Sequence, residues 1–343
     1  MNITFYMSDV HACGHVRGEV MAREVNANAP NHDVVCKTDI LISDYKRSNV
    51  MVFQRASDPA VFAKLQLAKK NGIKTIYDVD DDYLNTPKEF NKPYIYYSRP
   101  EVQDNIRKFL AVADAITVST YELAKSLAPY SEKVSKFVIK NALDVQMWDK
   151  VFMDRLSATD DGSVTIGWMA SGSHTIDAPL VIPAIKRIMK EYPNVKLHLI
   201  GWVGWEQLGQ EFNEHKERIK VEPWTNIVML PQVMADIDIG IAPLVDNLFN
   251  RAKSNIKWLQ YAALGSPCVA SDLAPYQDIQ NGVDGFVVKH DDPDGWYDSL
   301  KKLVEDKTLR LQVGVTARKR LCAEFDMKQM YRNWISVFDK VAE

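Results

Sequence analysis

Short apolar runs alternate with amphipathic stretches along most of the chain. In the first half, runs rich in β-branched residues lie at 3–7, 33–36, 50–54, 74–79, 115–119 and 136–140. Between several of them, apolar residues recur at helical spacing, at 17–27, 58–71, 101–112 and 120–128. Continuous apolar strands separated by amphipathic helices are typical of a parallel sheet that is covered on both faces. The pattern predicts a doubly wound α/β domain.

The same pattern starts again after 149–163, a polar stretch that ends in Asp-Asp-Gly-Ser. Strands are predicted at 164–169, 195–201, 238–244, 267–271 and 285–289, and helices near 178–191 and 253–263. Two helices close the chain, at 307–324 and 327–341. The last has a single apolar stripe, formed by Met330, Trp334, Val337, Phe338 and Val341. Such a stripe predicts that this helix packs against another surface.

The repeated pattern divides the chain into two domains. At 343 residues the chain is too long for one ordinary core. We expect domains at 1–150 and 164–325, a linker at 151–163, and a final helix at 326–343 that packs back on the first domain. Ligands of doubly wound sheets bind beyond the carboxyl ends of the strands, so two facing domains predict a site in the cleft between them.

Composition narrows the class of protein further. A formal net charge of -3 gives no global reason to expect nucleic acid or an acidic membrane as a partner. The four cysteines are scattered without CxxC spacing, which predicts a reduced, cytoplasmic setting rather than disulfides or zinc. The N-terminus does not resemble a signal peptide, and no apolar run approaches the roughly 20 residues of a membrane span. Peripheral contact with a membrane stays open.

The segment 249–272, FNRAKSNIKWLQYAALGSPCVASD, has the densest candidate chemistry. Arg251, Lys253 and Ser254 lie where the predicted helix begins, and free N–H groups and the helix dipole favour a phosphate there. Lys257 and Gln260 follow at one-turn intervals. A diphosphate at the helix start would leave Gln260 free to reach a ribose hydroxyl. Alternatively, the basic residues are solvated charges on an amphipathic helix.

The tail of this segment, AALGSPCVASD, resembles the donor-binding motif of the retaining glycosyltransferases of group 1, as do 275–288 and 307–321. The resemblance covers the second half of the chain and extends more loosely into the first. It implies the GT-B fold, in which two Rossmann-like domains face a cleft. The family's two acidic residues fall here on Ala252 and Gln260. Gln accepts a hydrogen bond from a ribose hydroxyl without the charge assistance of a carboxylate.

A second candidate loop lies at 166–179, where His174 follows a strand end and Asp177 precedes a helix. In the family this loop neutralises the leaving diphosphate, which the resemblance implies for His174. Loop N–H groups at Ser171, Gly172 and Ser173 suit a phosphate as well. The alternative is a local pair or helix cap formed by His174 and Asp177.

Two first-domain loops are also expected at the cleft. After the first strand, His15 and Arg17 are candidates beside the transferred sugar, although Gly14 alone explains a tight strand-to-helix turn. The loop lacks the G-x-G-x-x-G fingerprint of a nicotinamide site. Asp78 and Asp80 imitate a DxD metal motif. Because Asp is common at strand ends and the resemblance implies metal independence, acceptor recognition or loop ordering is the expectation for both.

The resemblance predicts the role of each site residue. The predicted catalytic residues are Lys253, Arg251, His174 and His15. Donor binding is predicted for Gly14, Ser171, Gly172, Ser173, Arg251, Lys253, Ser254, Asn255, Lys257 and Gln260. An acceptor or cleft position is predicted for Arg17, Asp78, Asp80 and Asp177.

The implied reaction is hexosyl or pentosyl transfer from a UDP- or GDP-linked sugar to an acceptor hydroxyl, with retention and without a metal or other cofactor. The expected acceptor is a surface polysaccharide or a lipid-linked glycan. Alternatives are a hydroxymethylated DNA base, as in phage enzymes, and an epimerase, hydrolase or inactive nucleotide-binding subunit of the same fold.

Overall fold

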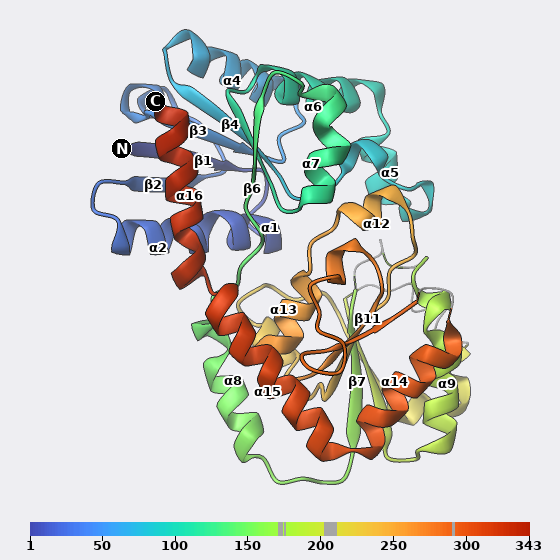
Figure 1. The fold of residues 1–343 in the computed structure, drawn as a ribbon. Coiled ribbons are helices and arrows are strands. Elements are labelled where there is room, and N and C mark those ends of the chain that lie inside the picture. The colour runs from blue at the N-terminus through green and yellow to red at the C-terminus, as the bar shows by residue number, and fades with distance from the viewer. Residues whose placement is uncertain (171–173, 175, 202–210, 290–291) are drawn as a thin grey trace.

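The computed structural model describes residues 1–343 except 171–173, 175, 202–210 and 290–291. Two six-stranded sheets form the centres of two domains, one above the other in Figure 1. Neighbouring strands in both sheets pair in parallel. In the described part of the chain, no helix is both long enough and apolar enough to cross a membrane.

The first sheet has the order β2-β1-β3-β4-β5-β6. Its strands are β1 (Asn2–Met7), β2 (Asp33–Lys37), β3 (Val50–Gln54), β4 (Lys74–Val79), β5 (Ala115–Val118) and β6 (Ser135–Val138). The helices of this domain are α1 (Ala12–Gly14), the π-helix η1 (His15–Glu19), α2 (Val20–Asn28), α3 (Ile42–Arg47), α4 (Pro59–Lys70), α5 (Lys92–Tyr97), α6 (Pro100–Val112) and α7 (Tyr121–Leu127). The strand order reverses between β1 and β3, which is where a doubly wound sheet binds ligands.

The second sheet has the order β12-β11-β10-β7-β8-β9. Its strands are β7 (Val164–Met169), β8 (Val195–Ile200), β9 (Ile219–Glu222), β10 (Ile239–Ala242), β11 (Cys268–Ser271) and β12 (Phe286–Val288). The helices are α8 (Gln146–Ser157), α9 (Ile182–Glu191), α11 (Leu230–Val233), α12 (Leu248–Ala252), α13 (Ile256–Ala263), α14 (Pro293–Glu305) and α15 (Lys307–Glu324). When the strands are numbered within this domain alone, their order in the sheet is that of the Rossmann fold. The order reverses between β7 and β10.

Helix α13 lies very close to the second sheet. A Cβ at Gly240 would collide with the ring of Tyr261, so only glycine lets the helix approach strand β10 this closely. The Tyr261 hydroxyl donates across the gap and lies 3.2 Å from the carbonyl oxygens of both Gly167 and Ile241. These contacts fix the helix against the carboxyl ends of β7 and β10.

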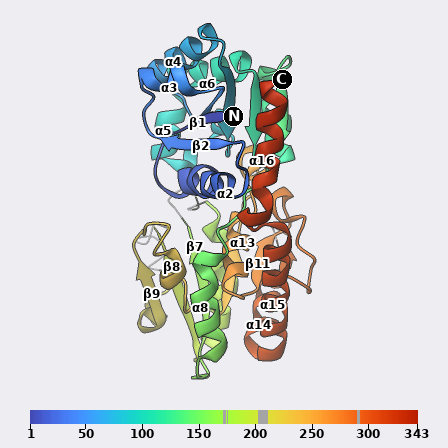
Figure 2. The ribbon, with the colours of Figure 1, turned by 90° about the vertical axis from the view of Figure 1, so that its left-hand side faces the viewer.

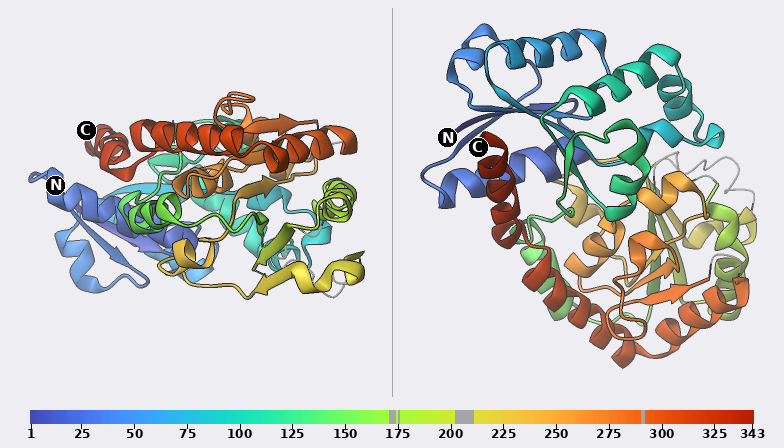
Figure 3. Two further views of the ribbon diagram at one scale, coloured as in Figure 1. Left: turned by 90° about the horizontal axis from the view of Figure 1, so that it is seen from below. Right: turned by 45° about the horizontal axis from the view of Figure 1, so that its top comes forward.

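The last helix, α16 (Met327–Ala342), leaves the second domain and packs on the first (Figures 2 and 3). Its apolar stripe, including Trp334 and Phe338, lies in the same buried cluster as Phe5 of β1. The rings of Phe5 and Trp334 meet edge to face at 5.8 Å. The expected fold, two facing doubly wound domains with a returning C-terminal helix, is therefore confirmed.

The stretch predicted as a linker is largely helical. Helix α8 extends to Ser157, and its Trp148 and Val151 are buried in a second-domain core cluster. The predicted linker looked polar in sequence because Val151 is the only fully buried residue that the helix contributes to it. Strand β9 was not predicted, because its four residues are partly or fully exposed and show no apolar run.

The helix predicted at 253–263 is also different, since two helices occupy this region. Helix α12 starts at an Asn247 cap and ends at Ala252, and Lys253 is extended, with φ -61° and ψ 160°. Helix α13 then begins at Ile256. The predicted helix start is therefore a turn between two helices, which directs the side chains of 251–255 differently from a continuous helix.

Candidate functional site

A cavity of about 320 Å³ lies between the two domains. It is lined by residues that follow β1 and β4 in the first domain and β7 and β10 in the second, including Cys13, Asp81, Ala170 and Leu244. Both strand-order reversals therefore open on the same space. This is the position at which paired doubly wound sheets hold a ligand.

The second-domain wall of the cavity is cationic. Lys253 and Ser254 line it from the turn between α12 and α13, and Lys257 and Gln260 line it from α13. The Lys257 ammonium donates to the carbonyl oxygen of Met169 at 2.8 Å. Burial, with added repulsion from Lys253, lowers the pKa of Lys257 to about 7. An anion in the cavity would favour the charged form of Lys257.

Gln260 supplies an open acceptor beside these cations. The residue is only 4% exposed, and its Oε1 has no hydrogen-bond partner among the described residues. A buried amide oxygen without a partner is unfavourable by about 1–3 kcal/mol. A ligand hydroxyl would satisfy it.

His174 and Asp177 form a buried pair. His174 lines the cavity, and its Nδ1 lies 2.7 Å from Oδ2 of Asp177. The other carboxylate oxygen of Asp177 accepts from the backbone N–H of Val245 at 2.7 Å. Burial raises the pKa of Asp177 to about 7 and lowers the pKa of His174 well below its ordinary value. A neutral imidazole thus faces the cavity, with Asp177 behind it, while Ser171, Gly172 and Ser173 lie outside the described residues.

The described cavity wall does not include Arg251 or Asn255. Arg251 is exposed and pairs with the Asp246 carboxylate through Nε and Nη2, the latter at 2.8 Å. The helix break explains this, because Arg251 belongs to α12 while Lys253 belongs to the turn. Ser254 remains at the cleft, where its Oγ accepts from the Asn141 side-chain amide at 2.9 Å across the domains.

In the first domain, Arg17 and Asp78 form a buried ion pair. Their side chains are 2% and 0% exposed, and Nη2 of Arg17 lies 2.6 Å from Oδ1 of Asp78. Arg17 also donates through Nη1 to the Ile139 carbonyl and to Asn141 Oδ1, each at 2.9 Å. Arg17 borders the cavity, but its hydrogen-bonding groups mainly join η1 to β4 and to the chain that follows β6.

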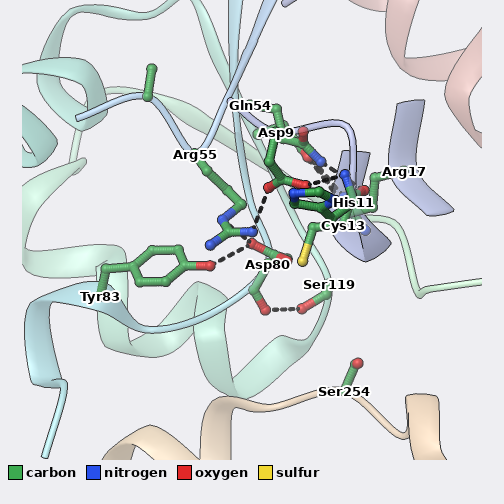
Figure 4. Close-up of polar contacts among 12 residues, drawn as sticks. Asp9, His11, Cys13, Arg17, Gln54, Arg55, Asp80, Tyr83, Ser119 and Ser254 are labelled. Atoms are coloured by element: carbon green, nitrogen blue, oxygen red, sulfur yellow. Dashed lines mark hydrogen bonds and ion pairs between the residues drawn. The ribbon is translucent and has the colours of Figure 1, made fainter. Parts of the chain in front are cut away.

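Asp80 lines the cavity within a second charged network (Figure 4). Arg55 lies between two carboxylates, with Nη1 2.9 Å from Asp9 Oδ2 and Nε 3.5 Å from Asp80 Oδ1. The Tyr83 hydroxyl donates to Asp80 at 3.0 Å. Burial acts to raise the pKa of Asp80, but Arg55 and a hydrogen bond from Cys13 outweigh it, so the pKa lies below its ordinary value. Within the described residues, no group of three or more His, Cys, Asp or Glu side chains is placed to hold a metal ion.

The loop after β1 places His15 in the cavity wall, where its Nδ1 lies 3.0 Å from Glu19 Oε2. Gly14 is not part of the described wall. A Cβ at Gly14 would collide with the backbone oxygen of Asp9, so glycine is needed for the tight turn itself.

Several residues of the described wall had not been singled out from the sequence. Asp81 and Cys13 line the cavity, as does the segment 224–228 with the half-exposed ring of Trp224. The DxD spacing is formed by Asp78 and Asp80. Asp81, which follows directly, is not part of that motif. No sequence signal marks 224–228, because strand β9 just before it shows no apolar run.

Comparison with known proteins agrees with this fold. Residues 164–306 match the family described as glycosyl transferases group 1. HepE from Anabaena, solved in complex with UDP-glucose, is 13% identical with a TM-score of 0.72, over 99% of this chain and 100% of that one. Sucrose-phosphate synthase from Thermosynechococcus elongatus is 12% identical with a TM-score of 0.70, over 99% of both chains. A glycosyltransferase from Rickettsia africae is 12% identical with a TM-score of 0.68, over 100% of this chain and 98% of that one.

No curated protein matches the chain in sequence. The two facing Rossmann-like domains have the GT-B fold. The second domain, over residues 164–306, matches the group 1 family of nucleotide-sugar-dependent glycosyltransferases. The resemblance noted in the sequence is therefore confirmed.

Proposed function

We propose that this protein transfers a sugar from a UDP-linked donor to a hydroxyl of a surface polysaccharide or lipid-linked glycan, with retention of configuration. The observation that carries the proposal is the pair of lysines, Lys253 and Lys257, that line the cavity beside the open Gln260 oxygen. The choice of uridine is supported by HepE, which was solved with UDP-glucose. Retention and metal independence rest on the family resemblance.

In this proposal the diphosphate lies against the turn between α12 and α13. Lys253 and Lys257 balance the negative charge that develops on the leaving diphosphate, and Ser254 donates a hydroxyl hydrogen bond. Gln260, one turn beyond Lys257, accepts from a ribose hydroxyl. His174 is held by Asp177 and faces the same charge.

The proposed domain roles follow from the same arrangement. Residues 164–325 bind the donor, 1–150 hold the acceptor, and 326–343 keep the two domains together. We place the protein in the cytoplasm, where the four free cysteines would stay reduced. His15 and Asp80 belong to the acceptor side of the cleft.

Two measurements test the proposal. Titration calorimetry with UDP and GDP should give binding for UDP, and a mass-spectrometric screen of UDP-sugars with glycan and lipid-linked acceptor pools should give a transfer product. A product only with hydroxymethylated DNA would contradict the acceptor class. Release of free sugar or of an epimer at the same rate without acceptor would contradict transfer itself.

A further inference from the structure

The strand end at β4 carries four aspartates, and three of them have structural partners. Asp78 pairs with Arg17, and Asp80 accepts from Tyr83. Asp82 accepts from the Ser126 hydroxyl at 2.5 Å and from the Asn85 amide at 2.9 Å. For the Asp81 side chain, the described residues provide neither a hydrogen bond nor an ion pair. Asp81 is therefore the exception in this run.

Asp81 is also placed where a ligand would meet it. It is partly buried and lines the interdomain cavity from the first domain, opposite Lys253 of the second. Burial raises the pKa of Asp81 and Asp80 adds to the rise, whereas Lys253 opposes it. A carboxylate held partly away from water without a partner is unfavourable until a donor group reaches it.

Gln260 gives an independent sign that the cavity takes a hydroxylated ligand, because its buried Oε1 also lacks a partner among the described residues. The two open acceptors belong to opposite domains. Lys253 and Lys257 lie in the same cavity wall as Gln260. A diphosphate against Lys253 would therefore place the attached sugar toward Asp81, since the sugar is bonded directly to that diphosphate.

We propose that Asp81 contacts the transferred sugar and selects an uncharged sugar over one that carries a carboxylate. This inference rests on the proposed function. Hydroxyl or amide groups of a neutral sugar can donate to the Asp81 oxygens. A uronic acid would bring a second carboxylate to the same space, and like charges in a partly desolvated site repel strongly.

The test compares donors that differ only at C6 of the sugar. We would measure dissociation constants for UDP, UDP-glucose and UDP-glucuronate, and for UDP-galactose and UDP-galacturonate. The wild type should bind the neutral member of a pair roughly tenfold or more tightly than its uronate. Asp81→Asn should keep the affinity for UDP and bring the neutral-to-uronate ratio close to one. As a control, Asp104→Asn removes an exposed carboxylate on α6 and should leave the ratio unchanged.

The outcomes separate this inference from the proposed function. If UDP binds but Asp81→Asn discriminates as the wild type does, the role of Asp81 is wrong and the proposed donor class stands. If the wild type binds uronates as well as neutral sugars, the inference is equally overturned. If UDP does not bind the folded wild type at all, both proposals fail. Circular dichroism of each variant shows that the comparison is made between folded proteins.

Discussion

The two walls of the cleft use charge in opposite ways. On the first-domain side, Arg17 and Arg55 are already engaged by Asp78, Asp9 and Asp80. On the second-domain side, Lys253 and Lys257 have no carboxylate partner among the described residues and repel each other. Both arginines of the first wall are paired with carboxylates, and of the carboxylates there only Asp81 lacks a partner among the described residues, whereas the two lysines of the second wall have no carboxylate partner among them. An anionic ligand is thus expected against the second wall.

The difference teaches that a charged residue near a cleft has one of two roles, depending on whether it already has a charged partner within the protein. Removing one member of a completed buried pair leaves an uncompensated charge and lowers stability. Removing a cation that waits for a ligand lowers binding or turnover and leaves the fold intact. Variants of Arg17 and of Lys253 distinguish the two cases.

The largest expected effect is on stability. Arg17→Ala should lower the free energy of unfolding by about 3–5 kcal/mol, because it leaves Asp78 buried and unpaired. Urea denaturation followed by circular dichroism measures this. Arg332→Ala, which removes an exposed arginine on α16, is the control and should change stability by no more than about 0.5 kcal/mol. Equal stability of both variants would mean that the first wall is not structural.

The next effect is on turnover. Lys253→Ala should reduce the rate of sugar transfer by about 10²–10³-fold, because a preorganised cation no longer faces the leaving diphosphate. Its melting temperature should stay near that of the wild type. Lys150→Ala is the matched control, since Lys150 is exposed on α8 and pairs only with Asp154 among the described residues. Wild-type turnover in Lys253→Ala would refute the assignment of the second wall.

The affinity for UDP should depend on pH. The pKa of Lys257 is about 7, and diphosphate binding favours its charged form, so affinity should be highest below pH 7. As the pH rises above 7, affinity should fall by at most about tenfold per pH unit for each group that must take up a proton. Asp177, whose pKa is also about 7, gains negative charge over the same range and acts in the same direction.

Calorimetry between pH 6.5 and 9 measures this dependence. Lys257→Arg keeps the positive charge over this whole pH range. It should therefore remove the part of the pH dependence of UDP affinity that is due to Lys257. The double variant Lys257→Arg, Asp177→Asn should bind UDP with almost no pH dependence. An unchanged slope in the double variant would show that neither group meets the diphosphate.

The smallest expected effect concerns the ribose. Gln260→Ala should weaken UDP binding by about 0.5–1.5 kcal/mol, the usual contribution of a neutral hydrogen bond. Binding of inorganic diphosphate should not change, because that ligand has no ribose. Gln260→Glu should bind UDP more tightly than Gln260→Ala, since a carboxylate accepts a stronger hydrogen bond. Equal losses for UDP and diphosphate would place Gln260 elsewhere.

Much of the fold followed from local pattern in the sequence. Buried parallel strands are continuous apolar runs, so β1, β3, β4 and β7 were predicted to within a residue. The apolar stripe of α16 required a partner surface, and the first-domain core provides it. Short or exposed elements were missed, because β9 buries too little of itself to leave an apolar pattern.

The sequence by itself determined the two-domain architecture, the resemblance of the second half to the group 1 glycosyltransferases, and the segment 249–272 as the richest in candidate chemistry. Only the tertiary structure decided which charges are free. Arg17 meets Asp78, 61 residues away in sequence, and a break at Lys253 turns Arg251 toward Asp246. The first pairing depends on how distant segments meet in the fold, and the second on where a helix breaks, so neither could be read from the local pattern of residues. For the same reason, Asp81 became distinct from its three neighbours only when their partners were known.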